Sequence, residues 1–117
     1  MTHVALAQKT EIWIVRHGEK DKTHPNDKDP NLSLEGRKRA EDLAVYLKKY
    51  QFNAAFSTPY KRTRQTLNPL VKQNKIDITA YRSAGELAEK INNQYKGKTL
   101  IVAGHSNTIL EIIEALG

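Results

Sequence analysis

The sequence has no cysteine, and no apolar run in it approaches the length of a membrane span. The lack of cysteine excludes a disulfide framework, a thiolate nucleophile and a metal site with cysteine ligands. The lack of a long apolar run excludes a conventional membrane-spanning helix. Aromatic residues make up only 7% of the chain, and the sequence lacks the mixed aromatic and basic clusters that bind single-stranded nucleic acids.

The remaining composition is that of an ordinary globular domain. The 117 residues suffice for one domain with one hydrophobic core, and the hydrophobic share of 38% lies beside a charged share of 27%. The formal net charge is +6, from 19 basic and 13 acidic residues. This balance favours anionic partners, either nucleic acid or phosphate-bearing molecules, although a solvated basic surface would give the same number.

The first ten residues contain Ala5-Leu6-Ala7, the small-x-small pattern of signal-peptide cleavage sites. The charged and apolar regions that precede such a site in a signal peptide are missing here. We interpret residues 1–10 either as the remnant of an export signal or as a leader without function. The protein is accordingly expected in the cytoplasm or, if the pattern marks a cleavage site, in an exported (periplasmic) location. Residues 11–117 are expected to form a single domain.

Short apolar runs alternate with segments of helical periodicity over the rest of the chain. We predict strands where the runs are short and rich in branched or aromatic residues, and helices where apolar residues recur every three or four positions. Ser33 is a suitable helix N-cap, Pro59 suits a first helical position, and Pro69 is expected to kink or divide its helix. The predicted strands are 12–15, 52–56, 76–81 and 99–103, and the predicted helices are 34–50, 59 to beyond 71, 84–95 and 108–116.

Strands that alternate with helices imply βαβ units, and hence a three-layer α/β/α sandwich with a mainly parallel sheet. Ligands bind such sheets at the carboxyl ends of the strands. Arg16 and His17 follow the first predicted strand, Arg62 comes soon after the second, and His105 follows the last. We therefore expect these four side chains to converge. Guanidinium groups match the oxygens of a phosphoryl group, and a neutral imidazole is able to act as a nucleophile.

Three motifs at these strand ends resemble the histidine phosphatase superfamily, whose fold is called phosphoglycerate mutase-like. They are Arg16–Glu19 with Leu32–Gly36, then Ser57–Thr66, and finally Gly104–Ser106. A lone Arg-His-Gly triplet is a weak signal, whereas segments in this order, each at a strand end, are specific. The resemblance covers nearly the whole chain from Glu11 onward.

The resemblance implies a phosphatase that needs no metal or other cofactor and works through a phosphohistidine intermediate. His17 would attack phosphorus in line, and water would then release phosphate. Arg16, Arg62 and His105 would bind the equatorial oxygens and supply the charge that magnesium brings in other phosphoryl transfers. Gly18 would permit close approach to the anion. Further substrate contacts are expected from Ser57, Ser106 and Asn107.

The acid that protonates the leaving group is less well marked. Many family members carry a carboxylate after the third strand, and the nearest candidate here is Glu86, which also fits an ordinary position in the first turn of a helix. Without an acid, phosphohistidine or acyl phosphates are favoured over alkyl phosphates as substrates. The long substrate-capping insertions of the mutases are absent, so the chain looks most like the short phosphohistidine-phosphatase branch.

The C-terminal end also departs from the family pattern. Members usually continue with sheet-forming sequence after the helix that follows the second histidine, whereas this chain ends at Gly117. We expect either a minimal domain or the loss of a part, and a bare sheet edge would favour a homodimer. The expected partner is a phosphorylated small molecule or a protein carrying phosphohistidine. The alternatives are a phosphatase of sugar phosphates or other small phosphomonoesters, and a non-catalytic module that binds phosphate or nucleic acid.

Overall fold

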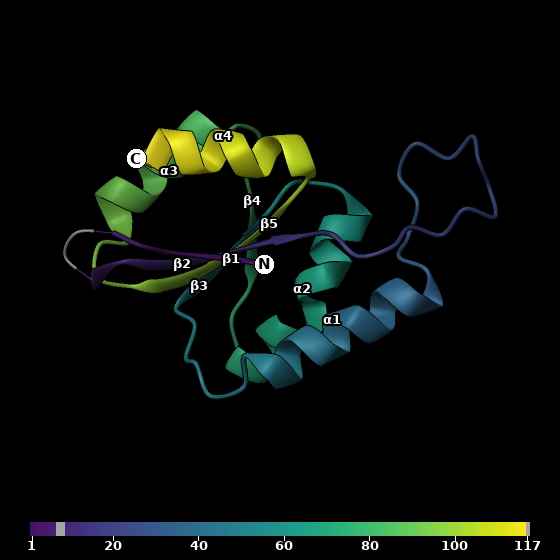
Figure 1. Ribbon diagram of the computed structural model, residues 1–117, viewed down its shortest axis with the longest axis horizontal. Helices are drawn as coiled ribbons and strands as arrows, with labels where there is room; N and C mark the ends of the chain where they lie inside the picture. The colour runs from purple at the N-terminus through teal and green to yellow at the C-terminus, as the bar shows by residue number, and fades with distance from the viewer. Residues whose placement is uncertain (7–8, 117) are drawn as a thin grey trace.

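A five-stranded sheet lies between two pairs of helices in the computed structural model, which describes residues 1–6 and 9–116 (Figure 1). The strands are β1 (Thr2–Ala5), β2 (Glu11–Arg16), β3 (Ala54–Ser57), β4 (Ile78–Ala80) and β5 (Thr99–Gly104), and the helices are α1 (Leu34–Tyr46), α2 (Lys61–Asn74), α3 (Ala84–Gln94) and α4 (Ser106–Leu116). Helices α1 and α2 cover one face, and α3 and α4 cover the other. The predicted three-layer α/β/α sandwich is thereby confirmed.

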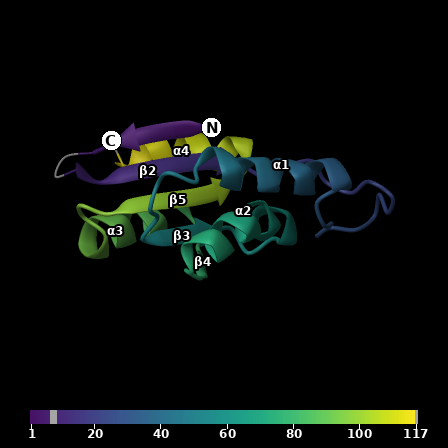
Figure 2. The ribbon, with the colours of Figure 1, turned by 90° about the horizontal axis from the view of Figure 1, so that it is seen from below.

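The strands are arranged in the order β1-β2-β5-β3-β4, with β1 and β4 at the two edges (Figure 2). The pairs β2–β5, β5–β3 and β3–β4 are parallel, and β1 runs antiparallel to β2. The carboxyl ends of the four parallel strands β2, β5, β3 and β4 therefore lie side by side at the same end of the sheet. This end is where the sequence predicted the convergence of functional side chains.

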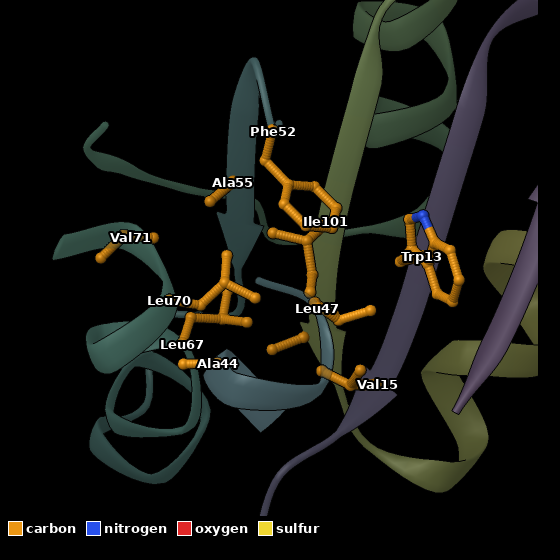
Figure 3. Close-up of a cluster of buried hydrophobic side chains, with 11 residues drawn as sticks. Trp13, Val15, Ala44, Leu47, Phe52, Ala55, Leu67, Leu70, Val71 and Ile101 are labelled. Carbon is orange, nitrogen blue, oxygen red and sulfur yellow. The ribbon is translucent and has the colours of Figure 1, made fainter. Parts of the chain in front are cut away.

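The central strands are buried on both faces, which explains their continuous apolar runs. In β2, Trp13 and Val15 contribute to the core beneath α1 and α2, whereas Ile12 and Ile14 belong to the core beneath α3 and α4. Figure 3 shows the first of these cores, in which Leu47 and Phe52 meet side chains of β5 and α2. Because successive strand residues face opposite sides, both layers of helices fix the register of β2.

Two prolines near α2 were predicted to mark its first position and to kink or divide it. Pro59 precedes the helix, which begins two residues later at Lys61, and Tyr60 occupies the N-cap position. The backbone amide of Lys61 donates to the carboxylate of Asp29 at 2.9 Å, so the long loop before α1 supplies the cap. Pro69 lies inside α2 and does not divide it, because the helix continues to Asn74.

The N-terminal segment, which was expected to be a leader outside the domain, contributes β1 to the sheet. His3 stacks on Trp13 of the neighbouring strand with ring centroids 4.2 Å apart, and Val4 and Leu6 pack against the core beneath α3 and α4.

Ala7 of the Ala5-Leu6-Ala7 pattern and Gly117 lie outside the described residues. The export interpretation, the boundary at residue 10 and the homodimer stay predictions. In the described ranges, no helix has the length and apolar character needed to cross a membrane.

Candidate active site

Two histidines stand side by side where β2 and β5 end. Arg16 pairs with Gly104 at the last position of the parallel ladder, and the amide of His17 donates to the carbonyl oxygen of Gly104 at 3.1 Å. His17 and His105 are the residues that directly follow these two strands, and their ring centroids are 5.1 Å apart at an interplanar angle of 65°. Residues separated by almost ninety positions of sequence thus meet because two adjacent parallel strands end in register.

Arg62 reaches the same place from the first turn of α2. Its guanidinium lies over the ring of Tyr60, 4.5 Å from the centroid, and that ring in turn contacts His105 with centroids 5.3 Å apart. The Nε atom of Arg62 is buried and has no hydrogen-bond partner among the described residues. Buried polar groups are normally paired, so this donor marks a position that an anionic ligand would satisfy. Arg16 lines the adjoining depression together with His17.

The hydrogen bond of His17 determines which ring nitrogen is free. Nδ1 lies 2.8 Å from the carbonyl oxygen of Gly18, and because a carbonyl oxygen only accepts, Nδ1 carries the proton. Nε2 therefore bears the lone pair. Burial lowers the pKa of His17 below its ordinary value of 6.5, although the hydrogen bond to Gly18 opposes this shift. The positive charges of Arg62, Arg16 and Lys20 lower this pKa further, so the ring is neutral near pH 7.

His105 shows the same effect more strongly. Burial is the largest cause that lowers its pKa, to about 4, and the neighbouring Arg62 and His17 are the next causes. Lys20 also lowers the pKa of both histidines and lines the depression beside His17. The sequence analysis did not identify Lys20; its position three residues after the nucleophile candidate was the available signal.

The loop that carries His17 is held from two sides. On one side, the amide of Gly18 donates to Thr66 Oγ1 at 3.0 Å, and this hydroxyl donates to the carbonyl of Arg62 at 2.7 Å. The amide of Gly18 is therefore already paired in this arrangement. Thr66 lies in the motif quoted from the sequence, but its role was not predicted.

On the other side, the first turn of α1 presses against the same loop. Ser33 caps the helix by accepting from the amide of Gly36 at 3.1 Å, and its own amide donates to the carbonyl of Glu19 at 2.8 Å. A Cβ atom on Gly36 would lie only 2.4 Å from the carbonyl oxygen of Glu19. The serine and glycine of the Leu32–Gly36 motif thus permit a close contact between α1 and the loop after His17.

Each of the two histidines lines a depression whose rim carries basic side chains. One, of about 640 Å³, is lined in part by His17, Lys20 and Lys22. The other, of about 420 Å³, is lined in part by His105, Asn107 and Arg82. Glu19 and Glu35 also border the first depression, and the carboxylate of Glu19 pairs with the guanidinium of Arg39 at 2.8 Å. Such a charge distribution favours anionic ligands.

Three other residues that were predicted to belong to the site are not among the described residues that line the two depressions. Ser57 is fully buried, and its hydroxyl donates to the carbonyl of Thr58 at 2.7 Å, so it does not face a ligand. Ser106 is an exposed residue at the start of α4. Glu86 lies in the exposed first turn of α3 and is not among the described residues that line either depression. Of the predicted additional contacts, Gly18 and Asn107 do line the depressions.

Comparisons with known proteins agree with this geometry. Residues 12–88 match the sequence model of the histidine phosphatase superfamily (branch 1). The chain therefore belongs to the histidine phosphatase superfamily. One curated relative is the 55 kDa subunit of transcription factor tau from Saccharomyces cerevisiae, with 32% identity over 87 residues, covering 64% of this chain and 20% of that protein. The chain thus spans about a fifth of the length of that relative.

Solved structures share the fold at low sequence identity. A protein from Agrobacterium tumefaciens assigned as the phosphohistidine phosphatase SixA has a TM-score of 0.72 and 22% identity, covering 89% of this chain and 73% of that one. The histidine phosphatase SixA complexed with tungstate gives 0.71 and 18%, with coverages of 87% and 73%. A mycobacterial glucosyl-3-phosphoglycerate phosphatase gives 0.72 and 15%, with 87% and 76%. These likenesses show that the fold is phosphoglycerate mutase-like.

Replacing Gly36 with alanine should destabilise the protein by about 1–3 kcal/mol, the usual cost of forcing extra atoms into a packed site. It should also lower phosphatase turnover, because the new methyl group would displace the backbone of Glu19 and with it the loop that carries His17. Urea unfolding and hydrolysis of an aryl phosphate measure the two effects. Gly85→Ala is the matched control, since a Cβ there meets no heavy atom of the described residues within 4 Å. Equal losses in both variants would contradict this role of Gly36.

The depressed pKa of His105 predicts that the folded state loses stability as the pH falls from about 6.5 to about 4. In that window the unfolded chain binds a proton on this histidine that the folded state does not bind, so unfolding is favoured by acid. The free energy of unfolding, measured in urea at several pH values, should therefore fall less steeply for His105→Asn than for the unmodified protein. The same slope in both proteins would show that His105 does not carry the shift.

Proposed function

We propose that this protein is a metal-independent phosphatase that forms a phosphohistidine intermediate on His17, and that its substrate is a phosphohistidine side chain of another protein. The observation that carries this proposal is the neutral His17 ring, whose Nδ1 is bonded to Gly18 and whose Nε2 keeps its lone pair beside Arg16, Arg62 and His105. A neutral nucleophile surrounded by cationic groups suits attack on a phosphoryl group.

In the first step, Nε2 of His17 attacks phosphorus in line, a P–N bond forms, and the bond to the leaving group breaks. The guanidinium groups of Arg16 and Arg62 bind the equatorial oxygens, and the unpaired Nε of Arg62 gains a partner. A bound dianion raises the pKa of His105, because a nearby negative charge favours the protonated ring. The site thus becomes more cationic when its substrate arrives.

In the second step, water attacks the phosphorus of the intermediate, the P–N bond to His17 breaks, and inorganic phosphate leaves. Metal independence is proposed because Arg16, Arg62 and Lys20 already place positive charge at this end of the sheet. Preorganised donors of this kind each contribute roughly 3–4 kcal/mol to transition-state stabilisation in enzymes studied by mutation.

The position of the predicted acid favours a substrate with a good leaving group, because Glu86 lines neither depression among the described residues. The larger depression is bordered by Glu19, whose carboxylate is engaged with Arg39, and by Glu35, an exposed residue in the first turn of α1. The imidazole of phosphohistidine leaves with less help from a general acid than an alkoxide does. The fold that this chain shares with SixA agrees with this choice. The open, basic rim with Lys20 and Lys22 would suit an acidic surface around the phosphorylated residue.

A second candidate is a phosphatase of sugar phosphates or other small phosphomonoesters. The depression of about 420 Å³ beside His105 favours it, because its size is that of a small-molecule site and Tyr60 and Asn107 would contact a sugar. The solved glucosyl-3-phosphoglycerate phosphatase has the same fold.

His17→Ala should lower the turnover of an aryl phosphate by about 10³-fold or more, since loss of a covalent nucleophile typically has effects of this size. Alkaline quenching of the unmodified protein during turnover should trap an acid-labile phosphate on His17, and EDTA should have little effect. His24→Ala, which changes an exposed loop residue, is the control and should keep full turnover. Normal turnover by the His17 variant would defeat the proposal.

The same assay compares substrate classes. A phosphohistidine peptide should show a higher kcat/KM than an alkyl phosphate. The reverse preference would favour the second candidate, and tight phosphate binding without any turnover would indicate a binding module.

A further inference from the structure

A chain of buried hydroxyl groups lies against His105. Thr58 Oγ1 is 3.1 Å from Nε2 of His105 and 2.7 Å from Thr63 Oγ1. Thr63 Oγ1 in turn donates to the backbone carbonyl oxygens of Thr58 at 3.1 Å and Tyr60 at 3.0 Å. The two threonines are 5% and 0% exposed, so water does not replace these contacts. Neither threonine was predicted from the sequence to belong to the site.

The order of donation along this chain follows from its two ends. Carbonyl oxygens only accept, so the single hydroxyl proton of Thr63 is directed toward them. The short contact between the two hydroxyl oxygens then requires the proton of Thr58. The reverse order would leave the oxygen of Thr63 within 3.1 Å of two carbonyl oxygens without a proton between them, which is repulsive.

With its only proton given to Thr63, Thr58 accepts a hydrogen bond from His105. Nε2 of His105 is therefore protonated in the neutral ring, and Nδ1 is the nitrogen that is able to gain a proton. This tautomer is opposite to that of His17, in which Nδ1 carries the proton. The two imidazoles thus differ in the nitrogen that each holds ready for reaction.

The hydrogen-bonded hydroxyl groups of Thr58 and Thr63 also join two separate parts of the site. Thr58 and Thr63 flank the start of α2, which carries Arg62, whereas His105 follows β5. The hydroxyl contact spans 47 positions of sequence and fixes the ring of His105 relative to Arg62. A rotation of that ring would break the contact and leave buried polar atoms unpaired. The charged and titratable groups that act on His105 are Arg62, His17, Arg16 and Lys20.

We propose that Thr58, supported by Thr63, is a positioning residue that holds His105 in the Nε2–H tautomer and makes Nδ1 the nitrogen that gains a proton when a phosphoryl group binds. Its part in catalysis rests on the phosphatase function proposed above, whereas the tautomer is independent of it. Thr58 touches neither the reacting phosphorus nor the nucleophile, and it acts through His105.

Nitrogen-15 NMR of the imidazole side chains tests the tautomer directly. The unmodified protein at pH 7 should show His105 with Nε2 protonated, and His105→Asn identifies its signals. Thr58→Ser should keep this pattern, whereas Thr58→Val should lose it. Thr79→Val is the control, because this half-buried threonine lies in the edge strand β4 and has no side-chain hydrogen bond among the described residues. Nδ1 protonated in the unmodified protein, or an unchanged tautomer in Thr58→Val, would overturn the proposal.

Kinetics test the consequence for turnover. Thr58→Val should lower kcat by roughly tenfold to a hundredfold, the range measured when the hydrogen-bond partner that orients a metal-bound histidine is removed. The pH dependence of kcat should also change its shape, and Thr58→Ser should restore both. A serine variant as impaired as the valine variant would contradict a role of the hydroxyl. If no phosphate ester or phosphohistidine is hydrolysed at all, the phosphatase proposal fails, and the NMR measurement still decides the tautomer.

Discussion

The parallel pairing of β2 with β5 is the constraint on which the site depends. It places Arg16 opposite Gly104, so that the residues that follow, His17 and His105, emerge as neighbours. A slip of one residue would turn every side chain of β2 to the other face, which moves Ile12 and Trp13 into the wrong cores. The packing of both helical layers on the sheet therefore maintains the distance between the two imidazoles.

The site brings several positively charged side chains together, and the repulsion between them is limited because the two histidines are neutral. Burial is the largest cause that lowers the pKa values of His17 and His105, and the charges of Arg62, Arg16 and Lys20 lower them further, so both rings remain uncharged at neutral pH. A phosphoryl dianion reverses this balance, because it attracts the guanidinium groups and favours protonation of His105. The free protein is thus prepared for an anion, and part of the repulsion is relieved when the anion binds. The net charge of +6 acts in the same direction over a longer range.

Much of the fold and of the site was predictable from the sequence. The apolar runs of β2 and β5 and the cap at Ser33 are strong local signals, and the meeting of His17 with His105 follows from parallel topology. Strand β1 was missed because four residues at a sheet edge carry little periodicity, and their pairing depends on Trp13 and its neighbours. These contacts exist only in the folded chain.

The supporting residues of the site were not predictable in the same way. Ser57 was chosen as a substrate contact, whereas the chain buries Ser57 and brings Thr58 to His105, a difference of one position that depends on how β3 ends. The hydrogen bond from the amide of Gly18 to Thr66 depends on where α2 packs. The positive charge of Lys20 lowers the pKa of both histidines because the fold brings it near their rings. The spacing of residues in the sequence does not report such distances.

The most direct test of the account is a crystal structure of the protein soaked with tungstate or vanadate at neutral pH. The account predicts one tetrahedral or trigonal-bipyramidal oxyanion with its metal atom facing Nε2 of His17 and its oxygens on Arg16, Arg62 and His105. An oxyanion bound elsewhere, or one that contacts His17 through Nδ1, would contradict it.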